Sequence, residues 1–222
     1  MERKRYLMVM AGGSGTRMGA ELPKQFLEIG GKAILQITLE RFIEADPGLD
    51  VIVVLPAEHR EYWKKYCYSH NFNLRQTLVS GGITRFHSVR NGLSKVPEGA
   101  LVAIHDAVRP LVSADLVQRL WSAAEGCGAA VPAVPVVDTI KSLDGERVDR
   151  SRLLSVQTPQ VFRSELLKEA YRRPYDTSFT DDASVAEAAG VTVRYVEGER
   201  FNLKITTPDD LVLCRALISS IR

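Results

Sequence analysis

Short apolar runs alternate with longer amphipathic segments along this chain of 222 residues, and this alternation restricts the possible folds more than any other feature. It is typical of βα units, in which each strand is followed by a helix that packs against a mostly parallel sheet. The predicted strands cover residues 6–10, 51–55, 101–105, 129–131 and 192–196. The predicted helices cover residues 34–45, 58–71, 86–93, 114–127, 164–171, 182–189 and 208–218. We therefore expect an α/β fold with a doubly wound, mostly parallel sheet.

Length and charge balance narrow the class of protein further. A chain of this length is the size of one large α/β domain, so we expect residues 1–222 to form a single domain. Hydrophobic residues make up 45% and charged residues 25%, which excludes disordered, collagen-like and membrane-spanning classes. The 29 basic and 27 acidic residues leave a net charge of only +2, so we expect neither nucleic acid nor a membrane surface as a partner. An anionic ligand would have to bind at one local site.

The cysteines and the N-terminal segment both favour a cytoplasmic protein. Cys67, Cys127 and Cys214 lie far apart, without a CxxC pair and without histidines at the spacing of zinc ligands. The apolar run at residues 6–11 follows a basic start but is shorter than the roughly 7 to 15 residues of a secretory signal. We therefore expect a reduced protein that stays in the cytoplasm.

One segment, residues 132–157, interrupts the alternation. Residues of high β propensity flank an Asp144-Gly145 turn signal, and no helical period is present. This pattern predicts an extended hairpin that projects from the core as an arm, although an ordinary hairpin at a sheet edge has the same pattern. An exposed arm with apolar residues would pack against a partner chain.

A glycine-rich loop, Ala11–Gly19, follows the first predicted strand. Glycines at this density let backbone N–H groups approach an anion closely. The loop is neither a P-loop, because no Gly-Lys-Ser/Thr closes it, nor a dinucleotide fingerprint, because Met18 occupies the third glycine position. Arg17 and Lys24 add fixed positive charge, which phosphoryl or nucleotidyl transfer requires, although both could also be solvated surface residues.

Three further segments combine polar residues with the ends of predicted elements. Gly81-Gly82 opens the helix that contains Ser88, and such a turn can receive an anion or the flat edge of a base. Asp106 ends an apolar strand, where a carboxylate could hold magnesium between phosphates. Arg109 could bind a phosphate, or it could simply pair with Asp106 across a turn. Lys204 could neutralise a bound phosphate.

Taken together, these segments resemble the 2-C-methyl-D-erythritol 4-phosphate cytidylyltransferase family over nearly the whole chain. Each motif is weak alone, but their joint order and spacing are specific. The motifs are Ala11–Gly19, Pro23–Leu27, Gly81–Val89, His105–Pro110, Asp138–Lys141, Gln157–Gln160, Thr180–Ser184 and Asn202–Lys204. The resemblance implies a nucleotidyltransferase (Rossmann-like) fold, the substrates CTP and methylerythritol phosphate, magnesium, and a homodimer that exchanges its arms.

The resemblance also implies a role for individual residues. CTP would be bound by Ala11, Gly12, Gly13, Ser14, Gly15, Gly81, Gly82 and Ser88. The catalytic residues would be Arg17, Lys24, Arg150 and Lys204, with Asp106 directed toward the metal. The acceptor would be bound by Asp106, Arg109, Thr139, Arg150, Thr180 and Lys204, with Thr139 and Arg150 supplied by the arm of the partner. Gly12 departs from the alanine of many family members, which should matter little because backbone groups bind the nucleotide.

The implied reaction is an in-line attack of the acceptor phosphate on the α-phosphorus of CTP, and pyrophosphate leaves. This nucleophile is already an anion, so the reaction needs no Ser/His/Asp or Cys/His set, and the chain has none that is convincing. Three alternatives remain open. They are a ribitol 5-phosphate cytidylyltransferase, a nucleotidyltransferase for sugar 1-phosphates, and a non-catalytic nucleotide-binding module.

Overall fold

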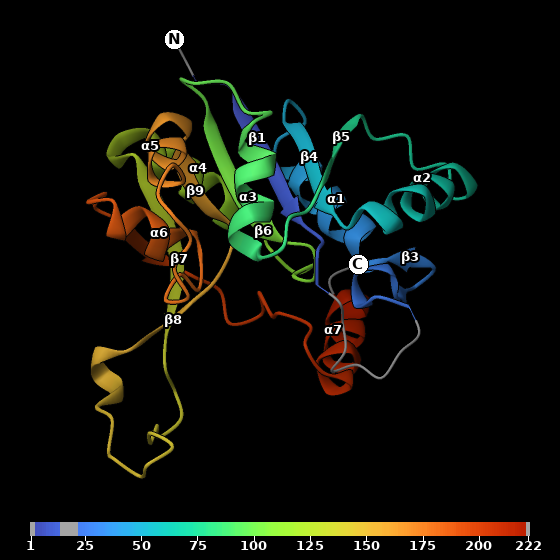
Figure 1. Ribbon diagram of the computed structural model, residues 1–222. Helices are drawn as coiled ribbons and strands as arrows, with labels where there is room; N and C mark the ends of the chain where they lie inside the picture. The colour runs from blue at the N-terminus through green and yellow to red at the C-terminus, as the bar shows by residue number, and fades with distance from the viewer. Residues whose placement is uncertain (1–2, 14–21, 221–222) are drawn as a thin grey trace.

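A mixed sheet of eight strands forms the centre of the molecule in the computed structural model, which describes residues 3–13 and 22–220 (Figure 1). The strand order is β10-β7-β9-β6-β1-β4-β5, and β8 pairs with β7 beside this path. Neighbouring pairs are parallel except those that involve β8 or β9. The strands are β1 (Arg5–Met10), β4 (Asp50–Leu55), β5 (Gln76–Ser80), β6 (Leu101–Asp106), β7 (Ala129–Pro135), β8 (Leu154–Val156), β9 (Gln160–Arg163) and β10 (Arg194–Glu197).

Helices cover both faces of this sheet. The helices are α1 (Ile34–Ala45), α2 (Arg60–Ser69), α3 (Arg85–Leu93), α4 (Ala114–Cys127), α5 (Ser164–Ala170), α6 (Asp182–Ala188) and α7 (Pro208–Ser220). The described residues also contain three short 3₁₀ turns, which are η2 (Lys24–Phe26), η3 (Ala57–His59) and η4 (Arg150–Arg152). Along β1, Leu7 and Val9 pack with α1, α2 and α4, whereas Met8 packs with α3, α5 and α6. Successive side chains of a strand point to opposite faces, so this division confirms the doubly wound fold.

The sequence pattern missed two strands of the main sheet, β5 and β9. β5 lies at the edge of the sheet and has a polar, half-exposed sequence, so its residues do not stand out in composition. β9 has four residues, starts with the buried polar side chain of Gln160, and runs antiparallel between β6 and β7. Its insertion makes the sheet mixed, although the sheet remains mostly parallel as predicted.

A third, smaller core lies beside the sheet, below the carboxyl ends of its central strands. It joins α7 to α1 and to the two-stranded ribbon of β2 (Glu28–Ile29) and β3 (Lys32–Ala33). Buried Ile205 belongs to this core, and its neighbour Lys204 is therefore held at a fixed place. Among the described residues, no helix has the length and apolar composition needed to cross a membrane.

The segment between β7 and β8 extends away from the sheet, at the lower left of Figure 1. The ends of the predicted arm, 132–135 and 154–156, belong to β7 and β8, so residues 136–153 form the projecting part. A bridge between Lys141 and Arg147 and a turn at Gly145, with φ at +91°, give it the expected hairpin form. Leu143, Val137 and Leu154 are exposed in this single chain.

Candidate active site

A cleft of about 340 Å³ lies at the carboxyl ends of β1 and β6. In a parallel sheet these ends meet at one edge, where loops that follow different strands come together. Eight of the residues predicted from the sequence line this cleft. They are Ala11, Gly12, Gly13, Lys24, Gly82, Ser88, Asp106 and Lys204.

The other predicted site residues have different positions. Gly81 is adjacent to Gly82 at the end of the same turn, and Arg109 contacts the cleft residue Asp106. Thr180 is exposed just before α6 and does not line the cleft. Ser14, Gly15 and Arg17 lie outside the described residues. Thr139 and Arg150 lie on the projecting arm, where they border a separate hollow of about 530 Å³.

The Gly81-Gly82 turn is tightly attached to the start of α3. The Gly82 N–H donates to Ser88 Oγ at 2.9 Å, and the Ser88 hydroxyl donates to the Thr84 carbonyl at 2.9 Å. Thr84 caps the helix by accepting from the His87 N–H. A Cβ built on Gly82 would lie 2.5 Å from His87 Cβ, so this close approach of turn and helix requires glycine.

Lys24 enters the cleft from the 3₁₀ turn η2. Although it is charged, the residue is 9% exposed, and its Nζ donates to the Ile205 carbonyl at 3.0 Å. The adjacent Gln25 donates from Nε2 to the Ala11 carbonyl at 2.9 Å. These two bonds fix the turn between the glycine loop and the small core, so the ammonium group is held within the cleft.

Asp106 is surrounded by positive charge. Its Oδ2 accepts from Arg109 Nε at 3.1 Å and lies 3.1 Å from Lys204 Nζ. Burial opposes ionisation of this carboxyl, but the nearby charges of Lys204, Arg109 and Arg85 outweigh burial and hold its pKa well below the usual range. The turn salt bridge that the sequence left open is therefore present. The single negative charge of Asp106 compensates only one of the two positive charges of Arg109 and Lys204. One positive charge therefore remains in excess.

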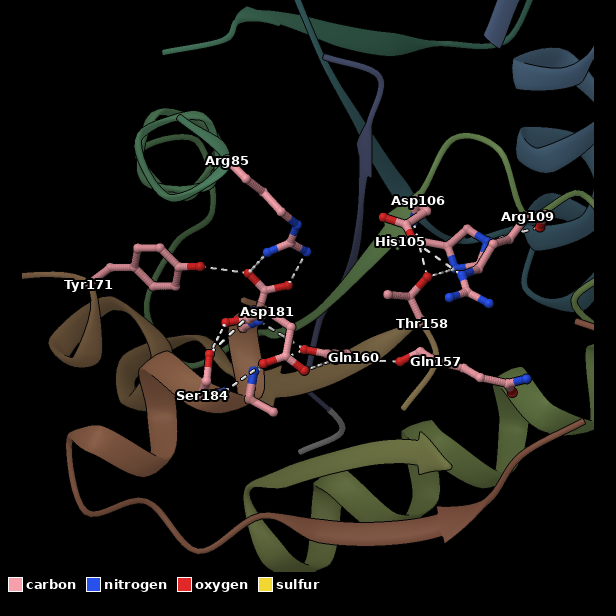
Figure 2. A network of polar contacts seen from close by, with 12 residues as sticks. Arg85, His105, Asp106, Arg109, Gln157, Thr158, Gln160, Tyr171, Asp181 and Ser184 are labelled. Atoms are coloured by element: carbon pink, nitrogen blue, oxygen red, sulfur yellow. Dashed lines mark hydrogen bonds and ion pairs between the residues drawn. The ribbon is translucent and has the colours of Figure 1, made fainter. Parts of the chain in front are cut away.

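A closed set of hydrogen bonds holds the turn between Asp106 and Arg109 (Figure 2). The Asp106 N–H donates to Thr158 Oγ1 at 3.1 Å, and Thr158 Oγ1 lies 3.0 Å from His105 Nδ1. His105 Nε2 lies 3.1 Å from the Arg109 carbonyl, which can only accept. This places the imidazole proton on Nε2 and lets the Thr158 hydroxyl donate to Nδ1. Burial lowers the pKa of His105 to about 4, so the ring is neutral.

A second polar cluster joins the cleft to α6, and the sequence pattern did not single it out. Arg85 lines the cleft and donates from Nη1 and Nη2 to the two carboxylate oxygens of Asp182, at 2.9 and 2.5 Å. Tyr171 donates its hydroxyl to Asp182 Oδ1 at 2.6 Å. The sequence does place Arg85 in the Gly81–Val89 motif and Asp182 in the Thr180–Ser184 motif. Nothing in either motif indicates that the two residues are partners.

The residues that line the cleft also test whether a metal fits. Among the described residues, no group of three or more His, Cys, Asp or Glu side chains could enclose a metal ion, and Asp106 is the acidic residue of the cleft wall. Magnesium commonly binds through one or two carboxylates, substrate phosphates and water rather than through a protein cage. A single carboxylate in a cleft that is also lined by the glycine residues Gly12 and Gly13 fits that mode.

Comparisons with known proteins indicate the family of this chain. The family model for 2-C-methyl-D-erythritol 4-phosphate cytidylyltransferase (IspD) matches residues 6–220. A relative of that name from Porphyromonas gingivalis strain W83 is 50% identical, with 99% of this chain and all of the relative covered. Another, from Bacteroides thetaiotaomicron, is 48% identical over 97% of this chain and all of the relative.

A solved structure agrees as well. The crystal structure of 2-C-methyl-D-erythritol 4-phosphate cytidylyltransferase from Thermus thermophilus is similar with a TM-score of 0.77 and 35% identity, covering 99% of this chain and all of that one. The match extends over the sheet, the cleft and the arm, because almost every residue of both chains is covered. The chain belongs to the 2-C-methyl-D-erythritol 4-phosphate cytidylyltransferase family.

Proposed function

We propose that this protein transfers a cytidylyl group from CTP to 2-C-methyl-D-erythritol 4-phosphate and releases pyrophosphate, a step in the synthesis of isoprenoid precursors. Family membership over residues 6–220 supports both substrates. The observation that carries the proposal is the cleft itself, in which a glycine loop, Lys24 and the Asp106–Lys204 pair converge. A non-catalytic nucleotide-binding module would not need this set of charges.

The nucleotide occupies the side of the cleft formed by the two glycine segments. Backbone groups of the loop at Ala11–Gly15 bind the phosphates, and Gly81, Gly82 and Ser88 bind the base. An oxygen of the acceptor phosphate forms a bond to the α-phosphorus while the bond to the pyrophosphate oxygen breaks. Both reacting groups are already anions, so no residue has to remove a proton. Lys24 and Arg17 stabilise the negative charge that collects on the equatorial oxygens.

The acceptor occupies the opposite side, near the end of β6. Arg109 and Lys204 supply the excess positive charge that attracts its phosphate, and Asp106 holds both cations in place. Thr180 contacts the acceptor from the turn before α6. Thr139 and Arg150 come from the arm of a second copy, so the active protein is a homodimer with exchanged arms. Two observations support this exchange: the arm extends away from the sheet of its own chain (Figure 1), and it exposes apolar residues.

Magnesium would complete the site, where Asp106 would hold it together with substrate phosphates and water. When bound, the ion supplies positive charge to the phosphates. We also place the enzyme in the cytoplasm, because all three cysteines are free thiols.

Pyrophosphate release tests the proposal directly. The purified protein is incubated with each of CTP, UTP, ATP and GTP, with or without magnesium, and with methylerythritol phosphate or ribitol 5-phosphate. We expect turnover with CTP, magnesium and methylerythritol phosphate. Equal turnover with ribitol 5-phosphate would assign the protein to the other acceptor, and no turnover with either would contradict the proposal.

A further inference from the structure

The cluster around Asp182 connects the cleft wall to the turn before α6. Arg85 is the first residue of α3, in the same short segment as Gly82 and Ser88 on the nucleotide side. Asp182 is the first residue of α6 and directly follows the turn that carries Thr180 on the acceptor side. The two residues are far apart in sequence, and their two parallel hydrogen bonds join these segments face to face.

Each member of the cluster is positioned by more than one contact (Figure 2). Tyr171 donates to the same carboxylate at 2.6 Å. Gln160 Oε1 accepts from the N–H groups of Asp182 and Ala183, at 3.0 and 2.9 Å. Gln160 Nε2 donates to Asp181 Oδ2 at 2.7 Å. The turn before α6 is thus attached to the sheet through Gln160 and to the cleft wall through Arg85.

The charges in this cluster are matched within the protein. Asp182 is completely buried, whereas one third of the Arg85 side chain is exposed toward the cleft. Burial opposes the charge on Arg85, but Asp182 outweighs burial and raises its pKa. Because the carboxylate compensates the guanidinium, the pair adds little net charge to the cleft. Its contribution to the reaction would therefore come from geometry rather than from attraction of phosphates.

We propose that Arg85 and Asp182 act as positioning residues for the transfer reaction: their pairing fixes the turn at residues 180–182 relative to the nucleotide-binding start of α3. This inference rests on the proposed function, since it assigns Thr180 to the acceptor side. In-line displacement is sensitive to the relative placement of its two reactants, so a displaced turn slows the reaction even when each substrate still binds. The nucleotide itself is held by the glycine segments and not by this pair.

Arg85→Lys tests the inference because it keeps the positive charge and removes the two-point contact. Arg90→Lys is the matched control, since Arg90 lies on the same helix, is exposed and does not line the cleft. We expect Arg85→Lys to lower kcat/KM for methylerythritol phosphate about tenfold or more, while the Kd for CTP, measured by calorimetry without acceptor, changes less than about twofold. Arg90→Lys should change neither.

A CTP affinity that falls by the same factor as kcat/KM would overturn the inference, and so would unchanged kinetics. Asp182→Asn serves as a second variant in case Arg85→Lys does not fold. It should also lower kcat/KM for methylerythritol phosphate while the Kd for CTP stays nearly unchanged. The kcat/KM of the double variant should be at most about twofold lower than that of either single variant, because the two residues act as a unit.

Hydrogen exchange gives a readout that does not depend on activity. In Arg85→Lys, the amides of Asp182 and Ala183 should exchange at least about tenfold faster, while those of the Gly81–Ser88 segment keep the wild-type rate. Unchanged exchange at Asp182 and Ala183 would show that Arg85 does not hold this turn. Failure of the wild type to release pyrophosphate would instead count against the proposed function, and the exchange result would still decide the role of Arg85.

Discussion

Two glycines of the cleft have different steric environments at the residue scale. A Cβ on Gly82 would lie 2.5 Å from His87 Cβ and 3.0 Å from the His87 backbone, whereas a Cβ on Gly12 would meet none of the described atoms within 4 Å. The contacts at Gly82 are with the Cβ and the backbone of His87, which cannot move aside as the end of a flexible side chain can. The sequence resemblance assigned both glycines to CTP binding, and the structure shows that a side chain would be accommodated differently at the two positions.

Gly82→Ala should therefore impair the site, and Gly12→Ala provides the matched control. We expect Gly82→Ala to displace the turn from α3 and to raise the KM for CTP about tenfold or more, while Gly12→Ala stays within about threefold of the wild type. Steady-state kinetics of both variants checks this, after thermal unfolding has shown that the two variants are equally stable. Equal loss in the two variants would mean that backbone flexibility, and not the approach to His87, is what the site requires.

His105 makes a specific prediction about acid stability. Its pKa is lowered from about 6.5 to about 4, chiefly by burial. Below pH 6.5 the unfolded chain binds a proton at this position and the folded protein does not, so stability falls as the pH decreases from 6.5 to 4. The full effect of such a shift is about 3 kcal/mol.

His105→Asn removes the titrating group and is the variant that tests this. The variant should be less stable at neutral pH, because packing against Phe42 and the bonds to Thr158 and Arg109 are changed. Its unfolding free energy should nevertheless fall less steeply than that of the wild type between pH 6.5 and 4. Urea unfolding in buffers without divalent cations measures the slope, and identical slopes would contradict a neutral, buried imidazole.

The docking of α7 is the most informative feature at the element scale. The helix packs through Cys214 and Ile218 against Ile29, Ile34 and other members of the small core. That core also buries Ile205, whose carbonyl accepts from Lys24. The position of the Lys24 ammonium group in the cleft thus depends on a helix that contributes none of the described residues of the cleft wall.

Thiol alkylation measures how firmly α7 is docked. Cys214 is fully buried and burial raises its pKa to about 11, whereas Cys127 is exposed at the end of α4. At pH 8, iodoacetamide should modify Cys127 readily and Cys214 at least about a hundredfold more slowly, because the thiolate is the reactive form. Peptide mass spectrometry of the native protein gives both rates. Comparable rates would mean that α7 detaches from the core without global unfolding.

At the scale of the whole molecule, an exchange of arms between two chains would make each active site contain residues of both chains. Arg150 lies on the arm, and in its own chain it donates to the Val137 carbonyl rather than to any residue of the cleft. Lys24 lies in the cleft. A dimer of one Arg150→Ala chain and one Lys24→Ala chain would then contain one site with both residues intact and one site with neither.

Mixing the two variants is therefore expected to restore activity that neither has alone. Purified heterodimers should reach about half of the wild-type activity, because one of the two sites is complete. Differently tagged chains allow the heterodimer to be isolated, and each homodimer serves as a control. No recovery in isolated heterodimers would mean that each chain uses its own Arg150 or none.

Local sequence predicted most of the fold and much of the cleft. The five predicted strands and the seven predicted helices exist, with shifts of a few residues at their ends. Four of these strands have apolar runs, which burial on both faces of the sheet requires, and caps such as Ser113 mark where helices begin. β5 and β9 were missed, as were the two-residue strands β2 and β3, since short or edge strands are selected by their neighbours in the sheet and not by their own composition.

By itself, the sequence determined the βα alternation and the glycine segments, which depend on residues close together in the chain, and the family, which depends on the order and spacing of motifs along the chain. Only the tertiary structure decided which charges meet. Asp106 pairs with Lys204 as well as Arg109, Lys24 donates to Ile205, and Arg85 pairs with Asp182. The physical reason is that Coulomb and hydrogen-bond energies depend on distances of a few ångströms in space, and the folding of the sheet brings together segments that are about a hundred or more residues apart.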